Sequence, residues 1–256
     1  MRRVICVPSL ALLVGLTVAA FPRASAQDGL TLFHKMQAAL GGADKIAAIQ
    51  DFEEQIHADI FDPSGKPLGH VDKRTRWIRP NYLRLDQIGL FDTYALYFDG
   101  TAGWEILPDK SVKELVGSEL KFAQDYLRGF DLNIWLADRD PHCRITSPAA
   151  NVVRIERVDD PSERTDTALD PVSGLPLRNN SIAPTDPAHP PTSGMIFEGW
   201  TTVQGVKFAT RRANFSQGGS AEITSDFIVV NRGLNLADLA AKPPDLKPVL
   251  RTHSAK

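Results

Sequence analysis

The spacing of hydrophobic positions changes along the chain. Between residues 30 and 40 they recur every three to four residues, which predicts a helix ending at Gly41-Gly42, and a short helix is expected over 43–49. From Phe52 to Ile60 apolar and polar residues alternate, which is typical of a half-buried strand. A turn of composition DPSGKP then leads into a second strand, so the pattern predicts a hairpin.

Alternation continues after a corner at Arg79-Pro80. It predicts strands on both sides of Asp99-Gly100, the strongest hairpin turn signal in the chain. Strand patterns return between residues 144 and 178 and again from 195 to 230, and a proline-rich stretch at 183–193 predicts a loop. Helical spacing interrupts the strands twice, at residues 118–128 and 130–137, and a short terminal helix is expected at 236–240. This order predicts an α+β fold with one curled antiparallel sheet.

The first 26 residues have the composition of a secretory signal peptide. Arg2 and Arg3 precede an apolar run over 4–21, and Ala24-Ser25-Ala26 follows it, so we expect cleavage after Ala26. A membrane anchor is the less favoured alternative, because Pro8 and Gly15 interrupt a run of barely spanning length. We therefore expect an exported periplasmic protein, with residues 27–256 forming one domain and a loose tail from about residue 245.

Charge and cysteine content narrow the classes of protein and of partner that fit this sequence. Loss of the leader would remove three arginines and no acid from 29 basic and 31 acidic residues, leaving a formal net charge of −5, which disfavours nucleic acid as a partner. Cys6 lies inside the leader and no cysteine stands at the cleavage point, so no lipid anchor is expected. Cys143 is then the only cysteine and cannot form an internal disulfide.

Common catalytic motifs are missing from the sequence. It contains no His-Glu-x-x-His, no Gly-x-Ser-x-Gly, no phosphate-binding glycine loop and no Cys-x-x-Cys. His57 and Asp59 share a strand face, and Asp138, Asp140 and His142 cluster near Cys143, but solvated strand faces and acidic turns are more common than sites with such residues. We therefore predict no catalytic residue, metal or cofactor.

Aromatic residues are the other candidates for function. A curved sheet covered by helices can enclose a pocket lined by such side chains, although composition alone favours an ordinary filled core. The candidate ligand-binding residues are Trp77, Leu83, Tyr94, Phe98, Trp104, Trp135 and Trp200.

Two ordered segments carry a family resemblance. Residues 77–84 read WIRPNYLR and residues 96–104 read LYFDGTAGW. Together with the leader, the helical segment, DPVSGLPLR at 170–178 and GVKF at 205–208, they resemble the LolA family of lipoprotein carriers and the wider LolA-like superfamily. The resemblance implies a half-open antiparallel β-barrel of about ten to eleven strands, with an N-terminal helix and a helical lid over an apolar cavity for acyl chains.

The same resemblance implies a role for Arg79. It matches the arginine that hydrogen-bonds the lid backbone and keeps the empty cavity closed, a role that its five fixed donors suit. We therefore predict a non-enzymatic, monomeric carrier of an acyl chain, lipoprotein or other hydrophobic ligand, with a membrane protein as possible transient donor or acceptor. An enzyme using His57 or His142 in the same cavity, and an envelope-stress sensor, remain alternatives.

Overall fold

The computed structural model describes residues 28–89, 93–107, 111–161, 163–180 and 193–240. The expected signal peptide, the tail from about residue 245 and nearly all of the proline-rich stretch lie outside these residues. Among the described residues, no helix is long and apolar enough to cross a membrane.

One antiparallel sheet contains all thirteen strands that the structure describes. Its order is β6-β5-β4-β3-β2-β1-β13-β12-β11-β10-β9-β8-β7, so the chain forms two runs of neighbouring strands that meet where β1 pairs with β13. The strands are β1 (Asp51–Phe61), β2 (Pro67–Ile78), β3 (Tyr82–Gly89), β4 (Tyr94–Phe98), β5 (Gly103–Ile106), β6 (Val112–Glu114), β7 (Cys143–Ala149), β8 (Val152–Arg157), β9 (Arg164–Leu169), β10 (Pro176–Asn180), β11 (Gly194–Val203), β12 (Val206–Ser216) and β13 (Gly219–Val230).

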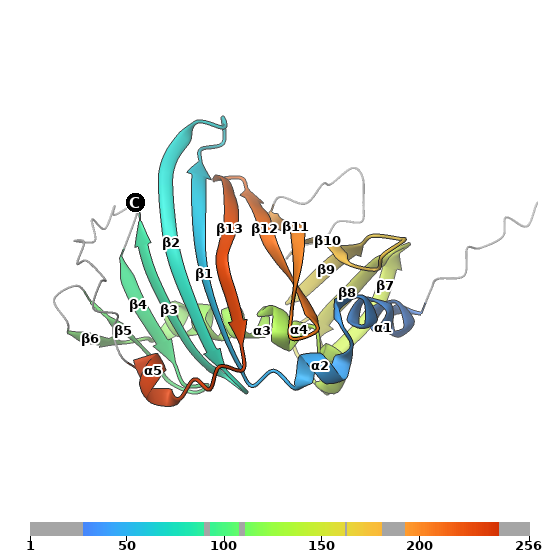
Figure 1. Ribbon diagram of the computed structural model, residues 1–256, viewed down its shortest axis with the longest axis horizontal. Coiled ribbons are helices and arrows are strands. Elements are labelled where there is room, and N and C mark those ends of the chain that lie inside the picture. Colours follow the sequence, from blue (N-terminus) through green and yellow to red (C-terminus); the bar gives the residue numbers. More distant parts are fainter. Residues whose placement is uncertain (1–27, 90–92, 108–110, 162, 181–192, 241–256) are drawn as a thin grey trace, which may run out of the picture.

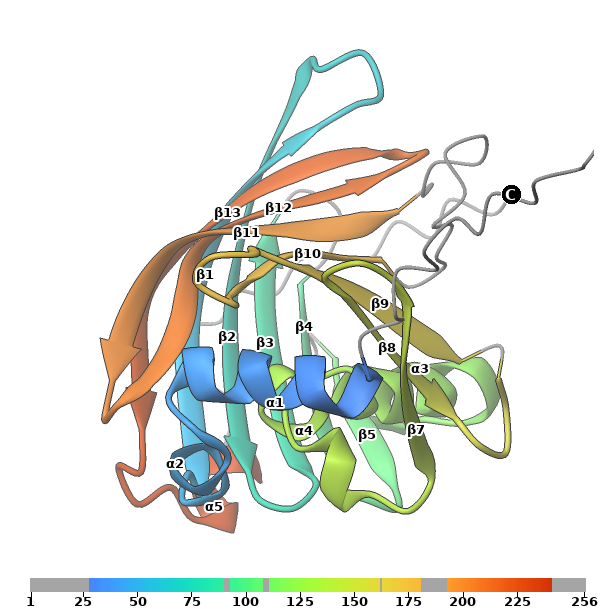
Figure 2. The ribbon, with the colours of Figure 1, turned by 90° about the vertical axis from the view of Figure 1, so that its right-hand side faces the viewer.

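Helical segments lie at the chain ends and between the two runs of strands. They are α1 (Gly29–Leu40), α2 (Ala43–Ala47), α3 (Gly117–Arg128), α4 (Asp131–Ile134), the 3-10 turn η1 (Ala137–Arg139) and α5 (Leu236–Ala240). Because β6 and β7 are the two end strands of the sheet, the connection through α3, α4 and η1 runs from one edge to the other (Figure 1). The sheet curls around these helices, and α1 packs against β7, β8 and β12 (Figure 2). We call residues 117–135, which contain α3 and α4, the lid.

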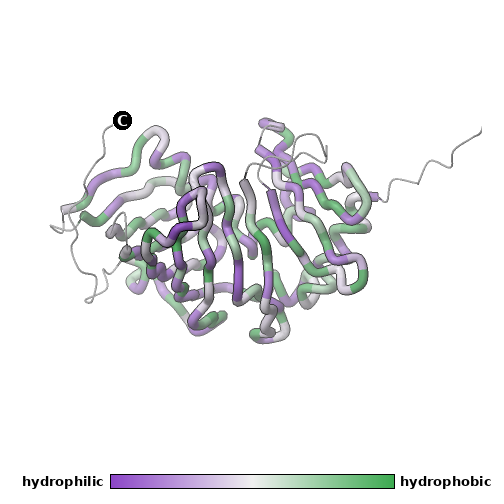
Figure 3. The backbone as a smooth tube through the Cα atoms, turned by 90° about the horizontal axis from the view of Figure 1, so that it is seen from above, coloured by the Kyte–Doolittle hydropathy of each residue, from purple (hydrophilic) through white to green (hydrophobic). Residues whose placement is uncertain are grey.

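The main core lies between the concave face of the sheet and the helices. Hydrophobic and hydrophilic stretches follow one another closely along the backbone, as Figure 3 shows, and on β1 the apolar residues Phe52, Ile56 and Ala58 lie on one face of the strand. Leu32, Phe33 and Leu40 of α1 are fully buried, as are Trp77 and Leu83 of the sheet. The lid adds Ala123, Leu127 and Leu132 to the same core.

A charged network attaches α5 to the opposite, convex face. Arg76 and Arg84 are cross-strand partners in β2 and β3, one position away from the concave-facing Trp77 and Leu83. Asp86 accepts hydrogen bonds from both, at 2.6 Å from Arg76 Nη2 and 2.9 Å from Arg84 Nε. The two arginines also donate to carbonyl oxygens of α5, at 2.8 and 2.7 Å. A helix too short to be stable alone is thus held by hydrogen bonds from two buried arginines to its backbone carbonyls.

The structure confirms most of the expected elements and changes several details. The first hairpin, the N-terminal helix and the helix over 236–240 are where the pattern predicts them. Thirteen strands replace the expected ten to eleven, partly because the exposed three-residue β6 has no apolar alternation to predict it. The single helix expected over 130–137 is instead two short pieces, α4 and η1.

Candidate functional site

Aromatic rings of the lid fill the concave side of the sheet. The Phe130 ring lies 5.4 Å from the rings of both Phe52 and Trp77, which belong to β1 and β2. Trp135, just after α4, lies 5.8 Å from the ring of Phe208 in β12. Phe52 and Phe208 are themselves 5.6 Å apart, so rings of sheet and lid form one continuous apolar cluster.

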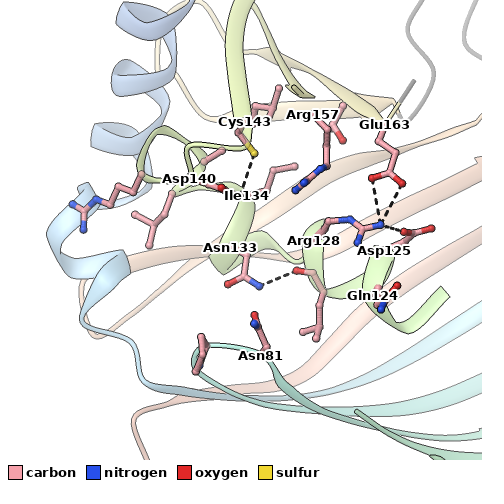
Figure 4. A pocket seen from close by; sticks show the side chains of 18 of the residues that line it. Asn81, Gln124, Asp125, Arg128, Asn133, Ile134, Asp140, Cys143, Arg157 and Glu163 are labelled. Atoms are coloured by element: carbon pink, nitrogen blue, oxygen red, sulfur yellow. Dashed lines mark hydrogen bonds and ion pairs between the residues drawn. The ribbon is translucent and has the colours of Figure 1, made fainter. Parts of the chain in front are cut away.

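A cavity of about 940 Å³ remains beside this cluster. Figure 4 shows residues that line it, from the lid, from the strands β7–β9 and from the corner between β2 and β3. Its apolar lining residues are Ala47, Pro80, Phe98, Leu127, Ile134, Leu136, Ala137 and Ile155. Amide and charged side chains, among them Asn81, Gln124 and Asn133, complete the wall, so the cavity is amphipathic.

Most cations of the cavity wall are already paired. Arg128 of α3 contacts Asp125 and Glu163 (Figure 4). Lys121 of the same helix contacts both carboxylates as well, with Nζ at 3.0 and 2.6 Å. Arg157 makes two hydrogen bonds to Asp159, at 2.9 and 2.8 Å. The contacts of Lys121 and Arg128 with Glu163 connect α3 with the turn between β8 and β9, and because they are partly exposed each stabilises the closed lid only weakly.

Arg79 lies on the wall of the cavity, but it contacts a different helix from the expected one. Its Nε donates to the Ile49 carbonyl at 3.0 Å and its Nη2 to the Ile46 carbonyl at 3.3 Å. Its guanidinium also stacks on the Trp77 ring, 5.0 Å from the centroid. Arg79 therefore joins the β2–β3 corner to the end of α2, whereas the resemblance implies contacts to the lid backbone. Its role as a latch stays a prediction.

Six of the seven other predicted ligand-binding residues lie on the concave side of the sheet or at the edge of the core, in three groups. Trp77, Leu83 and Trp135 are buried in the core, where the closed lid covers them. Phe98 lines the large cavity, and Tyr94 lines a smaller one of about 310 Å³ beside α3. Trp200 is half-buried at the edge of the core, with its ring 6.2 Å from that of Phe197.

Trp104 lies on the other face of the sheet. It pairs across strands with Tyr97, which pairs with Arg84, and their row continues to Arg76 on the convex side. The Trp104 and Tyr97 rings are 4.2 Å apart. Alternation within a strand predicts which residues share a face but not which face is concave, so the sequence could not separate Trp104 from the interior residues.

His57 and Asp59 share a face, as predicted, and that face is the convex one. His57 is paired with Asp72, with Nδ1 and Oδ1 2.9 Å apart, and this hydrogen bond raises the pKa of His57. Asp59 is the cross-strand partner of His70. In the described part of the chain, no group of three or more histidine, cysteine or acidic side chains is placed to hold a metal ion.

Cys143 lies at the cavity wall, 3.6 Å from an Asp140 oxygen. Burial, together with this carboxylate, raises the pKa of the thiol to about 11, so it is mostly protonated at neutral pH. Asp138 is turned away toward α1, where it accepts a hydrogen bond of 2.9 Å from Gln37. The acidic residues expected to cluster near Cys143 therefore have different partners: Asp140 lies beside the thiol, and Asp138 lies beside Gln37 of α1.

The sequence analysis missed a charged group on the concave face. Glu54 lies two positions after Phe52 on β1, and Arg212 lies four positions after Phe208 on β12. Residues an even number of positions apart share a strand face, so both charged residues belong to the face that carries the aromatic rings. The two form an ion pair. A signal was present: Glu54 lies between Phe52 and Ile56 at a position where alternation predicts an apolar residue.

Three solved structures share this architecture at low sequence identity. A DUF1329 family protein from Desulfovibrio piger aligns with 82% of this chain and 96% of its own, at 13% identity and a TM-score of 0.55. A LolA superfamily protein from Nitrosomonas europaea aligns with 84% of this chain and 99% of its own, at 10% identity and a TM-score of 0.54. The fold is LolA-like.

A third structure with the LolA-like fold is a putative outer membrane lipoprotein-sorting protein domain from Vibrio parahaemolyticus. It aligns with 83% of this chain and 97% of its own, at 14% identity and a TM-score of 0.53. No protein-family model and no curated protein matches the chain by sequence. The predicted resemblance is thus confirmed for the fold, and because one fold supports many functions, the ligand has to be argued from the site.

Proposed function

We propose that this protein is an exported, non-enzymatic binding protein that takes up the hydrophobic part of a ligand between the concave sheet and the lid. The observation that carries the proposal is the contact of Phe130 with Phe52 and Trp77. A lid that crosses the sheet from edge to edge fills an apolar interior with its own aromatic ring. Moving the lid would expose those rings to an acyl chain. The LolA-like fold supports this reading.

The lid would act by competition. Burial of hydrocarbon is favourable by about 0.8 kcal/mol for each methylene, so a ten-carbon chain gains about 8 kcal/mol at most. Part of this gain is offset, because the chain must displace rings that are already buried against the sheet. The apparent affinity is then the affinity of the open state multiplied by the fraction of molecules with an open lid, and this reduction lets a carrier release its ligand.

The existing cavity would receive the part of the ligand that stays partly wet. Its apolar residues, such as Leu127 and Ile155, adjoin the core, while Gln124 and Asn133 can form hydrogen bonds. An amphiphile matches this mixed wall better than a simple hydrocarbon.

Native mass spectrometry of the exported protein, purified without detergent, tests the proposal directly. We expect a bound amphiphile with an acyl chain, and we expect delipidated protein to bind the apolar dye N-phenyl-1-naphthylamine and to lose it to added lipid. Trp77→Ala should weaken dye binding, whereas Trp104→Ala on the convex face should not. Protein that carries no ligand and binds neither dye nor lipid would overturn the proposal.

A further inference from the structure

Trp77 forms the apolar contact between the sheet and the lid, yet its indole ring also contains one polar atom. The side chain is fully buried. The Phe130 ring of the lid lies 5.4 Å from the indole, between ring centroids, and the Arg79 guanidinium lies 5.0 Å from the indole centroid. The indole is therefore in the part of the interior that the closed lid covers.

The indole N–H of Trp77 makes no hydrogen bond. Nε1 is buried and has no hydrogen-bond partner among the described residues. Its two ring neighbours cannot supply one, because the Phe130 side chain has no acceptor oxygen or nitrogen and an arginine side chain carries only donors. The carbonyl oxygens of Ile46 and Ile49 are used by Arg79 itself. The closed lid thus buries a donor beside groups that offer it no acceptor.

A buried donor of this kind needs an explanation. Nearly all buried polar groups in folded proteins are hydrogen-bonded, buried tryptophan nitrogens included, and an exception destabilises the state that contains it. A phenylalanine would fill the same apolar interior without that penalty. Trp104, Trp135 and Trp200 are not among the described side chains with a buried nitrogen that lacks a partner. The unused donor therefore belongs specifically to the tryptophan that Phe130 covers.

We propose that Trp77 Nε1 donates a hydrogen bond to a carbonyl oxygen of the ligand once the ligand has displaced Phe130, and that the ligand is a fatty acyl ester or amide. This inference rests on the proposed function and adds to it the chemical group that lies among the aromatic rings. The hydrocarbon chain replaces the contacts of Phe130 with Phe52 and Trp77. The carbonyl group satisfies a donor that the closed lid leaves unused, and a pure hydrocarbon cannot do so.

The charge of the surroundings favours an ester or amide over a free carboxylate. A carboxylate that enters an apolar interior loses its hydration, and one indole N–H compensates for little of that loss. Asp131, the residue after Phe130 in the lid, shows the same effect. Burial raises the pKa of its carboxyl group to about 6, although the charge of Arg212 opposes the shift. The compartment that the lid covers therefore disfavours an anion.

A second buried donor on the concave face is a weaker candidate for the same role. Arg212 Nε also has no hydrogen-bond partner among the described residues. The same guanidinium, however, forms an ion pair with Glu54 and lies 3.1 Å from Ser225 Oγ. Arg212 is thus already held by polar groups of the protein, whereas Trp77 is the donor whose ring the lid contacts directly.

A ketone and an alkene of the same shape isolate the contribution of the carbonyl oxygen. In 2-methyl-1-undecene a methylene group replaces the oxygen atom of 2-undecanone, and the two molecules otherwise match. Both affinities are measured by displacement of N-phenyl-1-naphthylamine from delipidated protein. The ratio of ketone affinity to alkene affinity is compared between variants, because the different solubilities of the two ligands then cancel. We expect this ratio to be about three- to tenfold lower in Trp77→Phe than in the natural protein, as befits one hydrogen bond.

Trp135→Phe is the matched control. It makes the same change in another buried ring of the interior, one whose nitrogen is not among the buried atoms without a partner. It should weaken both ligands alike and keep the ratio of the natural protein. An equal fall of the ratio in Trp135→Phe and Trp77→Phe would overturn the assignment of the donor to Trp77.

NMR of the indole groups gives a readout that a merely structural role would not move, and it needs only the natural protein. The chain contains four tryptophans, so protein labelled with ¹⁵N-tryptophan has four indole N–H signals. In the ketone complex one of them should lie downfield of its position in the alkene complex, because its proton has gained an acceptor. That signal should be missing from the spectrum of Trp77→Phe.

The outcomes separate this inference from the proposed function. Equal ratios in the natural protein and Trp77→Phe, or indole signals at the same positions in both complexes, would overturn the carbonyl site and leave the proposed function intact. Decanoate that binds more tightly than methyl decanoate would overturn the uncharged class of ligand. Displacement of the dye by none of these compounds would overturn the proposed function as well.

Discussion

Replacement of Phe130 by alanine is the most direct test of a lid that competes with the ligand. The ring contacts two aromatic side chains of the sheet, Phe52 and Trp77, each at 5.4 Å between centroids. It also lies 6.5 Å from the Tyr126 ring in a stacked arrangement within the lid. Phe130→Ala therefore removes the main aromatic contact between lid and sheet and leaves the sheet side of the site unchanged.

The size of the effect follows from burial. Truncation of a fully buried phenylalanine to alanine costs about 3–5 kcal/mol, and Phe130 is half-buried, so about 2 kcal/mol is expected. If this amount is lost only from the closed state, the open fraction grows by up to about 30-fold, and apparent affinity for an acyl ligand rises by the same factor. The free energy of unfolding of the ligand-free protein should fall by about 2 kcal/mol.

Phe122→Ala is the matched control. Phe122 is also an aromatic residue of the lid, but it is 52% exposed, and the described ring contact that it makes is with Tyr126 of the same helix. Urea unfolding and dye displacement by decanoate would be measured for both variants. Tighter binding by Phe130→Ala, with little change for Phe122→Ala, is the expected result. Unchanged or weaker binding by a folded Phe130→Ala variant refutes competition by the lid.

The remaining predictions concern single contacts. If Arg79 is the latch that the resemblance implies, Arg79→Leu should raise ligand retention during detergent-free purification by about tenfold; if its carbonyl contacts to Ile46 and Ile49 only hold α2, lipid content will stay unchanged and the latch role is removed. Asp86→Asn should lower the free energy of unfolding, measured in urea, by about 3 kcal/mol, because Arg76 and Arg84 would remain buried without a carboxylate partner. Asp72→Asn, at a half-exposed residue, should lower it by less than about 1 kcal/mol. Equal losses of stability in the two variants would contradict this prediction. Iodoacetamide should modify Cys143 about 100-fold more slowly at pH 8 in the folded protein than in urea, given a pKa raised from 9.0 to about 11; equal rates would refute burial. Stability should fall as the pH rises from about 4 to about 6, because the folded protein holds the Asp131 proton more tightly than the unfolded chain, and Asp131→Asn should remove up to about 3 kcal/mol of this fall in urea titrations. An identical pH profile in the variant would exclude Asp131 as the cause.

The sequence predicts those elements whose signals are local. The hairpin turn around Asp62 forms because its carboxylate accepts hydrogen bonds from the backbone of Ser64 and Lys66, chemistry visible in the composition of the turn. The N-terminal helix begins at an Asp28 cap and ends where Gly41 adopts a positive φ of 126°. Both signals lie within a few residues, so no tertiary contact is needed to read them.

The candidate site depends on contacts between distant residues, and the sequence predicts much less of it. Trp77 and Trp135 were predicted as aromatic candidates, yet only the structure shows that the lid covers them and that Trp104 faces away. Glu54 and Arg212 are 158 positions apart and meet only because β1 and β12 both flank β13. A charged residue at an inward strand position marks such a site, but its partner has to be found in three dimensions.

The closed lid combines a favourable contact with an unfavourable one. Burial of the Phe130 ring stabilises the closed state, while burial of the neighbouring Asp131 carboxylate destabilises it at neutral pH, as the raised pKa records. If the lid were wholly apolar, displacing it would require a ligand with far more hydrocarbon surface. If it carried an unopposed charge, it would not close. The buried Asp131 carboxylate keeps the closed state only moderately stable, which is the condition under which a single acyl chain can open the lid and later leave.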